Sequence, residues 1–213
     1  AKEVEYRERM QSCYPIHPEV FDRLYEDWST LERFQRTRGV LRLMASVIHE
    51  LWMSNDASAM IMPGSIPLDV PNVREELIRY LGEGWNSIVS SEIDGKNSIP
   101  YQKDQANPRY GQKLAARRVA RAVMLGSAPT VRAQSVRGIE ASRIRLGVVQ
   151  PGESIADFND ALNTLRGSLA YLYTNASGDR YWYDTRPTLR KTAQDRATQF
   201  SGIDVEHEIE SRL

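Results

Sequence analysis

Two arginines near the start of one strongly amphipathic segment are the side chains best suited to bind a phosphate group. Arg38 and Arg42 are four residues apart, so they share a face if residues 38–53 form a helix. A guanidinium donates two parallel hydrogen bonds to a phosphate, which makes such an arginine a candidate phosphate-binding residue. The alternative is an arginine whose aliphatic stem packs on the protein while its head group stays in water. Spacing alone favours this alternative.

A second group of cations lies in residues 106–150, where nine Lys and Arg residues face one acid, Glu140, a surplus of eight. Over the whole chain, 28 Lys+Arg balance 28 Asp+Glu, so the surplus is a local asymmetry. The candidates for nucleic-acid contact are Lys113, Arg117, Arg121, Arg143 and Arg145. The first three recur every four residues, as expected for a helix face that contacts DNA phosphates. A solvated face, or a face that docks onto an acidic domain, would have the same pattern.

Complete catalytic and metal-binding motifs are absent from the sequence. A P-loop requires G-x-x-x-x-G-K-[ST], but around Gly95–Lys96 the first glycine is replaced by Ser90 and the last position is Asn97. His49–Glu50 opens like a zinc-protease motif, yet Met53 stands where the second histidine ligand is required. The three histidines are far apart, and no G-x-S-x-G nucleophile motif occurs. We therefore expect no catalytic residue, no metal site and no cofactor in this chain.

Apolar periodicity predicts a mostly helical fold of the α+β class. The strongest helix is expected over residues 38–53, with Thr37 as a possible N-cap. One apolar stripe on it consists of Val40, Met44, Val47 and Leu51, and a second group that widens it consists of Leu41, Ile48 and Trp52. A stripe of that width is typical of a helix that is buried on much of its surface.

The second half of the chain has the element order of a winged-helix module. Helices are expected over residues 112–125, 137–146 and 154–165, followed by strands at 169–174 and 180–184. The intervening residues, 175–179, form a hairpin loop, and the hairpin is the wing. The predicted organisation is a helical domain at 1–93, a loop or linker at 94–111, a winged-helix-like domain at 112–200 and an acidic tail at 201–213.

Composition indicates an ordinary globular protein, with 41% apolar and 26% charged residues. No apolar run approaches the roughly 18 residues of a membrane span, and the first residues contain no signal-peptide core. Cys13 is the single cysteine, so no internal disulfide is possible. We expect a cytoplasmic protein without a membrane partner, and the charged first residues, which lack an initiator methionine, indicate a fragment of a longer chain.

Seven short strings in the sequence carry a resemblance to a known family. They are Tyr14–Glu19, Phe34–Ala45, Arg117–Arg121, Leu125–Ala128, Arg137–Glu140, Leu146–Glu153 and Arg180–Thr185. These strings resemble large AAA+-type ATPases of bacterial phage-defence islands, which are relatives of the BREX-system ATPase and often accompany DNA methylases. The resemblance covers roughly residues 14–200.

The resemblance implies a place for the chain within a longer protein. AAA+ proteins have a P-loop domain followed by a helical lid, to which origin-recognition-like members add a winged helix. The lid's sensor arginine often lies in a Gly-x-x-Arg pattern, which Gly39–Arg42 matches, so the resemblance implies Arg42 as nucleotide sensor and Arg38 as runner-up. The P-loop and the acidic Mg²⁺-binding strand are missing from this sequence. ATP and Mg²⁺ are therefore expected only in the full-length parent.

Three functions follow as hypotheses. The leading one is a non-catalytic C-terminal fragment of a phage-defence ATPase, an AAA+-lid-like bundle followed by a winged helix that docks DNA or another domain. The alternatives are a stand-alone winged-helix nucleic-acid-binding module and a protein-interaction scaffold. The expected partners are the P-loop ATPase domain of the same polypeptide, duplex DNA, and a methylase or nuclease of the defence system.

Overall fold

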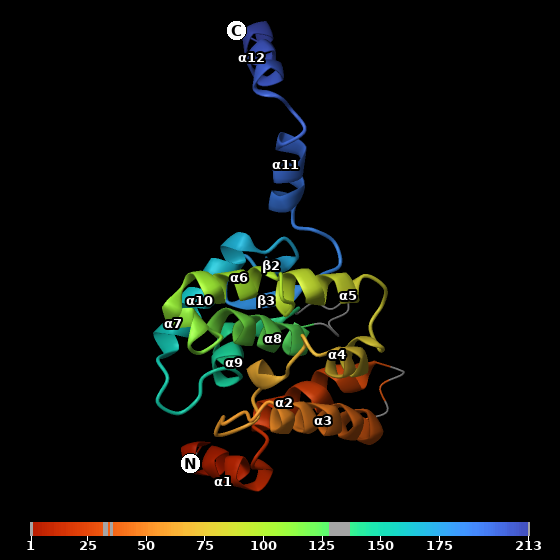
Figure 1. Ribbon diagram of the computed structural model, residues 1–213, viewed down its shortest axis with the longest axis vertical. Helices are drawn as coiled ribbons and strands as arrows, with labels where there is room; N and C mark the ends of the chain where they lie inside the picture. Colours follow the sequence, from red (N-terminus) through yellow and green to blue (C-terminus); the bar gives the residue numbers. More distant parts are fainter. Residues whose placement is uncertain (1, 32–33, 35, 128–136, 213) are drawn as a thin grey trace.

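The computed structural model describes residues 2–31, 34, 36–127 and 137–212 (Figure 1). The first part of the chain forms α1 (Lys2–Cys13), α2 (Pro18–Asp22), the π-helical turn η1 (Arg23–Asp27), the 3₁₀ turn η2 (Trp28–Thr30), α3 (Arg36–Met53), the 3₁₀ turn η3 (Pro63–Ser65), α4 (Pro71–Ile78), α5 (Trp85–Ile88) and the π-helical turn η4 (Val89–Ile93). The second part forms α6 (Ile99–Ala106), α7 (Pro108–Gly111), α8 (Ala115–Ser127), β1 (Ile139–Glu140), α9 (Ala141–Leu146), α10 (Ile155–Ser168), β2 (Leu172–Thr174), β3 (Arg180–Tyr183), α11 (Leu189–Ala197) and α12 (Gly202–Arg212). The predicted mostly helical α+β fold is confirmed.

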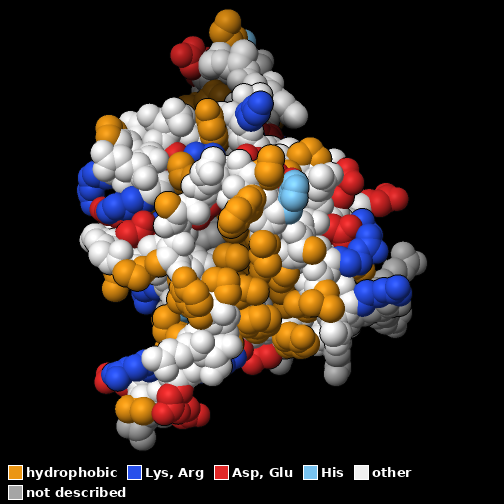
Figure 2. Space-filling model, turned by 60° about the horizontal axis from the view of Figure 1, so that its bottom comes forward, with side chains coloured by type: hydrophobic (Ala, Val, Ile, Leu, Met, Phe, Trp, Pro, Cys, Tyr) orange, Lys and Arg blue, Asp and Glu red, His pale blue; other side chains and the backbone are white. Residues whose placement is uncertain are grey.

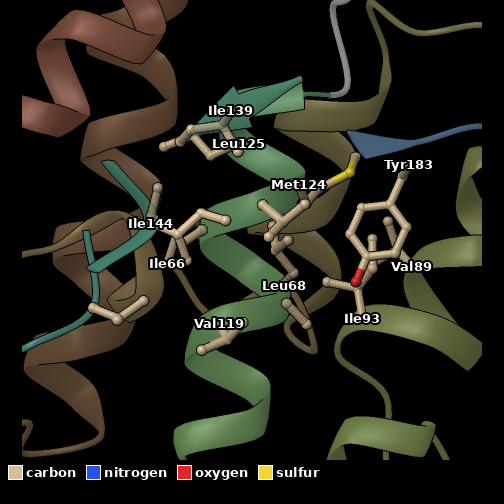
Figure 3. Packing of buried hydrophobic residues seen from close by; sticks show 14 of the residues in the cluster. Ile66, Leu68, Val89, Ile93, Val119, Met124, Leu125, Ile139, Ile144 and Tyr183 are labelled. Carbon is tan, nitrogen blue, oxygen red and sulfur yellow. The ribbon is translucent and has the colours of Figure 1, made fainter. Parts of the chain in front are cut away.

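The centre of the fold is α8, which the other elements surround. Every residue of α8 except Arg117 is buried, and the helix packs against α6, α10, η3 and β3. Figure 3 shows how Val119, Met124 and Leu125 of α8 meet apolar side chains from both halves of the chain. Gly126 allows β1 to approach the helix, since a Cβ at this position would collide with the Ile139 side chain. A single buried cluster, residues 20–183, thus continues across the predicted boundary at 94–111.

The second half has the predicted order of helices and hairpin, but residues 139–140, predicted as part of the helix at 137–146, form a further strand, and that helix begins at Ala141. The hairpin is formed by β2 and β3, and β1 pairs antiparallel with the other edge of β3, so the sheet order is β1-β3-β2. The chain therefore runs α8, β1, α9, α10, β2, β3, a winged-helix-like order. Strand β1 contains only two residues, too few for the alternation by which a strand is recognised in a sequence.

Two further local predictions are wrong. Residues 94–111 are not a loop, because they contain α6 and α7. Ser98 caps the start of α6 and Asn107 caps the start of α7, and each helix has a proline, Pro100 or Pro108, in its first turn. These prolines and polar residues resemble a loop in sequence, but they occupy first-turn positions that a helix tolerates. The strongest helix starts at Arg36, so Thr37 lies inside the helix and is not its N-cap.

The last two helices extend away from the body of the molecule (Figure 1). No residue of α11 is buried, and every side chain of α12 that the structure describes is exposed. Among the helices formed by the described residues, none has the length and apolar character needed to cross a membrane.

Candidate interaction surface

The cations of α8 lie inside the fold rather than on an open surface. The Nε atom of Arg121 donates to Oδ2 of Asp94 at 2.7 Å, and only 7% of the Arg121 side chain is exposed. Burial raises the pKa of the Asp94 carboxyl, and the neighbouring Arg121 guanidinium partly offsets that rise. Arg117 donates to Asp104 at 3.0 Å, and the same carboxylate accepts the backbone N–H groups of Ala116 and Arg117 at the start of α8. These arginines therefore connect α8 to the loops and helices around it.

The remaining predicted nucleic-acid contacts also have partners within the chain. Lys113 donates to Asp157 at 2.5 Å, Arg143 to Glu19 at 2.6 Å, and Arg145 to the side-chain oxygen of Asn159 at 2.9 Å. The carboxylates that meet these cations and the arginines of α8 include Glu19, Asp94, Asp104 and Asp157. Glu19 and Asp94 belong to the N-terminal half, outside the cation-rich segment. The local positive surplus is thus balanced by acids that the fold brings to it.

The helix in the position of a winged-helix recognition helix, α10, has acidic contacts near its N-terminus. Asp157 binds both Lys113 and Arg109, whose guanidinium also reaches Asp160 at 3.5 Å. These contacts to two cations lower the pKa of the Asp157 carboxyl. Elements α6 and α7 pack against the same helix. A DNA groove would have to displace these contacts to reach α10.

We expect duplex DNA to bind this chain weakly and without the steep salt dependence of a protein that makes many phosphate contacts. A protein with six to ten such contacts loses about 10³–10⁵ in affinity between 50 and 200 mM salt. Fluorescence anisotropy with a labelled duplex across that salt range measures the slope. A slope corresponding to several phosphate contacts would show that the paired cations exchange their carboxylates for DNA. Charge reversal of Arg117 and Arg121 would not test DNA contact alone, because it places acids beside Asp104 and Asp94 inside the fold.

One side of α3 presents apolar side chains to the surface, where no other part of the described chain covers them. Leu41, Ala45, Ile48 and Trp52 follow one another at intervals of four, three and four residues, which keeps them on one side of the helix. They are all exposed, with Leu41 64%, Ile48 44% and Trp52 81% accessible. Figure 2 shows apolar side chains gathered on the end of the molecule that carries α1, α2 and α3. Contiguous exposed apolar surface of this kind marks interaction sites in water-soluble proteins.

The sequence identified these residues but assigned them to the wrong environment. In the predicted stripe, Val40, Met44 and Val47 are buried and Leu51 is partly buried, and α3 packs with α4 and η1. Leu41, Ile48 and Trp52, which widen this stripe, were also expected to be buried, but they are exposed. Periodicity reports that a side chain prefers an apolar environment, but it does not report whether the same chain supplies that environment.

The two predicted phosphate-sensing arginines lie at the N-terminal end of the same face. Arg38 is exposed, and Arg42 follows it one turn later with 53% of its side chain accessible. Arg42 donates to Oε1 of Glu76 in α4 at 2.9 Å, and Arg79 donates to the same oxygen at 2.8 Å. The alternative of a packed stem with a solvent-facing head fits Arg42 only in part, because its head has a carboxylate partner.

Comparisons with known proteins identify one family. Within the described residues, no group of three or more His, Cys, Asp and Glu side chains is arranged to hold a metal ion. Neither the curated proteins nor the solved structures include a match to the chain. The model of one family, the DUF499 second domain, matches residues 1–183, a span that ends with β3 and leaves out α11 and α12. The chain therefore belongs to the DUF499 second-domain family.

Proposed function

We propose that this chain is a non-catalytic docking module of a larger ATPase, and that the exposed face of α3 packs against the P-loop domain of the same polypeptide. The observation that carries the proposal is the apolar face formed by Leu41, Ala45, Ile48 and Trp52, which a well-packed helix leaves in water. Leaving such surface exposed costs about 25 cal/mol per Å² relative to burying it. A partner that covers the face recovers this free energy.

The positive charges beside the apolar face indicate what kind of partner would fit it. Arg38 and Arg42 lie on the same exposed side of α3, at its N-terminal end. A domain seated on Leu41 and Ile48 would bring its surface close to both guanidinium groups. Guanidinium groups bind phosphate oxygens more specifically than ammonium groups do. A nucleotide-binding domain is therefore the occupant we propose, with Arg42 as the residue that contacts phosphate.

In this account the chain performs no chemistry by itself. ATP and Mg²⁺ bind to the P-loop domain of the parent, and this module changes its contacts when the phosphate is lost. The role of the buried ion pairs around α8 is to keep the module rigid, so that a change at Arg42 moves the whole body. The likeness to phage-defence ATPases belongs to the same proposal and rests on the sequence strings alone.

We expect Trp52→Lys to weaken binding to the separately produced P-loop domain by about 30-fold, which corresponds to the ~2 kcal/mol of a tryptophan hot spot. Isothermal titration of the 213-residue chain with that domain, in the presence of a non-hydrolysable ATP analogue, measures the change in affinity. The fold is expected to be unaffected, because 81% of the Trp52 side chain is in solvent.

Leu189→Lys is the matched control for that substitution. Leu189 is 87% exposed on α11 and lies outside the residues that the family model matches, so its replacement should leave the affinity unchanged. Arg42→Ala should weaken binding only when the nucleotide analogue is present. Equal affinities for wild type and Trp52→Lys would refute docking through α3, and equal losses for Trp52→Lys and Leu189→Lys would indicate unspecific apolar contact.

A further inference from the structure

One carboxylate oxygen lies between two arginines at the junction of α3 and α4. Oε1 of Glu76 accepts a hydrogen bond from Arg42 at 2.9 Å and another from Arg79 at 2.8 Å. Arg42 belongs to α3, whereas Arg79 is the C-cap residue of α4, so the two cations come from different helices. The other oxygen, Oε2, is buried and has no hydrogen-bond partner among the described residues.

We propose that Arg42 and Arg79 form a binding site for the terminal phosphate of a nucleotide, and that Glu76 occupies this site as an internal competitor. The proposal deepens the proposed function, on which it rests for the identity of the sensor. It adds a second phosphate-binding residue, Arg79, and a residue that opposes phosphate binding, Glu76. The affinity for phosphate is then set by the competition between Glu76 and the incoming anion.

The arrangement of the three side chains fits a phosphate oxygen. Each guanidinium presents several N–H donors in a fixed plane. Two guanidinium groups that converge on one anionic oxygen reproduce how arginines bind phosphate. Both cations are accessible, since 53% of the Arg42 side chain and 39% of the Arg79 side chain are exposed. Arg38, exposed one turn before Arg42, adds positive charge on the same side of α3.

Glu76 is a weak competitor because only half of its carboxylate is satisfied. The side chain is 14% exposed, so it has lost most of its contact with water. Oε1 has two donors, but Oε2 has lost its hydration without gaining a partner, which lowers the net stability of the contact. A phosphate presents three oxygens to the same arginines and carries more negative charge. Exchange of the carboxylate for phosphate is therefore favourable when a phosphate is delivered to the site.

The exchange has a structural consequence for the two helices. The Arg42–Glu76 pair joins α3 to α4, which pack against each other. Phosphate bound by Arg42 releases Glu76, and loss of phosphate restores the pair. The junction thus has two alternative sets of contacts, which is what a switch that follows the nucleotide state requires.

The test uses the whole chain and inorganic tripolyphosphate as the probe. Glu76→Gln is expected to bind tripolyphosphate about tenfold more tightly than wild type, because apparent affinity rises with the fraction of time the arginines are free. Isothermal titration at low salt measures the affinity. Adding Arg79→Ala to Glu76→Gln should abolish the gain. Equal unfolding midpoints for the variants would show that each still folds.

Glu140→Gln is the matched control. It also removes one carboxylate that is paired with an arginine, since Glu140 accepts from Arg180 at 2.7 Å, and its charge change is the same. The proposal requires no more than a small gain for this variant. Equal gains for Glu76→Gln and Glu140→Gln, or no gain for Glu76→Gln, would overturn it.

Two further probes separate the sources of phosphate. ATP should respond to Glu76→Gln as tripolyphosphate does, and a short DNA duplex should not. A gain confined to the duplex would overturn the nucleotide assignment in favour of a nucleic-acid backbone. Because these titrations need no P-loop domain, they stand even if docking through α3 fails, and docking can be observed even if Glu76→Gln has no effect.

Discussion

Replacing Arg121 with methionine is expected to lower the free energy of unfolding by about 3–5 kcal/mol, the cost of leaving one member of a buried ion pair alone. Arg121 donates to Asp94, and both side chains are almost fully buried, 7% and 1% exposed. Methionine retains most of the apolar stem, so the loss reports mainly the uncompensated Asp94 carboxylate. Urea unfolding followed by far-UV circular dichroism measures the change.

Two companion variants isolate that cause. Arg212→Met removes an arginine that is 78% exposed and paired with Glu208, so its unfolding free energy should match wild type within about 0.5 kcal/mol. Adding Asp94→Asn to Arg121→Met removes the unpaired charge while keeping an acceptor for the backbone N–H of Asp69, and should recover more than half of the loss. If Arg121→Met costs no more than Arg212→Met, α8 is not held by its cations.

Acidification is expected to destabilise the fold through His17. This residue is 4% exposed, and its Nδ1 accepts the backbone N–H of Glu19 at 3.2 Å, which caps α2. Burial lowers the pKa of His17 from 6.5 to about 4. Between pH 6.5 and about 4, His17 is protonated in the unfolded chain but not in the folded chain. Stability is therefore complete above pH 6.5 and falls as the pH drops towards 4, by up to ~3 kcal/mol at 1.36 kcal/mol per pKa unit.

His17→Asn is the variant that tests this effect. Asparagine is a good N-cap and does not titrate, so the helix start is kept and the proton-linked loss is removed. Burial also raises the pKa of Asp27 to about 6, which opposes the effect of His17 because that carboxyl takes up its proton in the folded state first. Both chains retain Asp27, so the difference between their unfolding free energies isolates His17. A difference that does not change between pH 7 and 4.5 would contradict the assignment.

Regular elements were predictable where the sequence pattern alone determines them. The helices α3, α8 and α10 and the hairpin β2-β3 follow from apolar periodicity and from the turn at 175–179. The region 94–111 was not predictable in the same way, because a proline in the first turn of a helix and a proline in a loop look identical. Strand β1 was missed because it forms only by pairing with Tyr181 and Arg180 of β3, which lie 42 and 40 residues later in the chain.

The candidate site was predictable only as a set of residues. The sequence identified Arg38, Arg42 and the apolar residues of α3, but their exposure depends on which face of α3 meets α4 and η1. Similarly, the cation-rich segment was correctly recognised as unusual, and its carboxylate partners could not be found because they lie as far as 124 residues away, as in Arg143–Glu19. Glu76 and Arg79 gave no signal in the sequence, since an acid and a base three residues apart are common on helix surfaces.

These observations assign different tasks to the two groups of cations. The arginines of α8 are matched by buried carboxylates and hold the body together, whereas Arg38 and Arg42 remain at the edge of an uncovered apolar face. A chain organised in this way is suited to transmit a contact made at α3 to the rest of the module.

The most direct test of the central claim is site-specific photo-crosslinking in the full-length polypeptide. A photoreactive phenylalanine analogue is placed at Ile48, in the middle of the apolar face, and at Phe200, which is 62% exposed beyond the family domain, as control. We predict that the probe at position 48 crosslinks to the P-loop domain of the same chain and that the probe at position 200 does not. A position-48 probe that reacts only with solvent, or with no more preference than the one at 200, would contradict docking through α3.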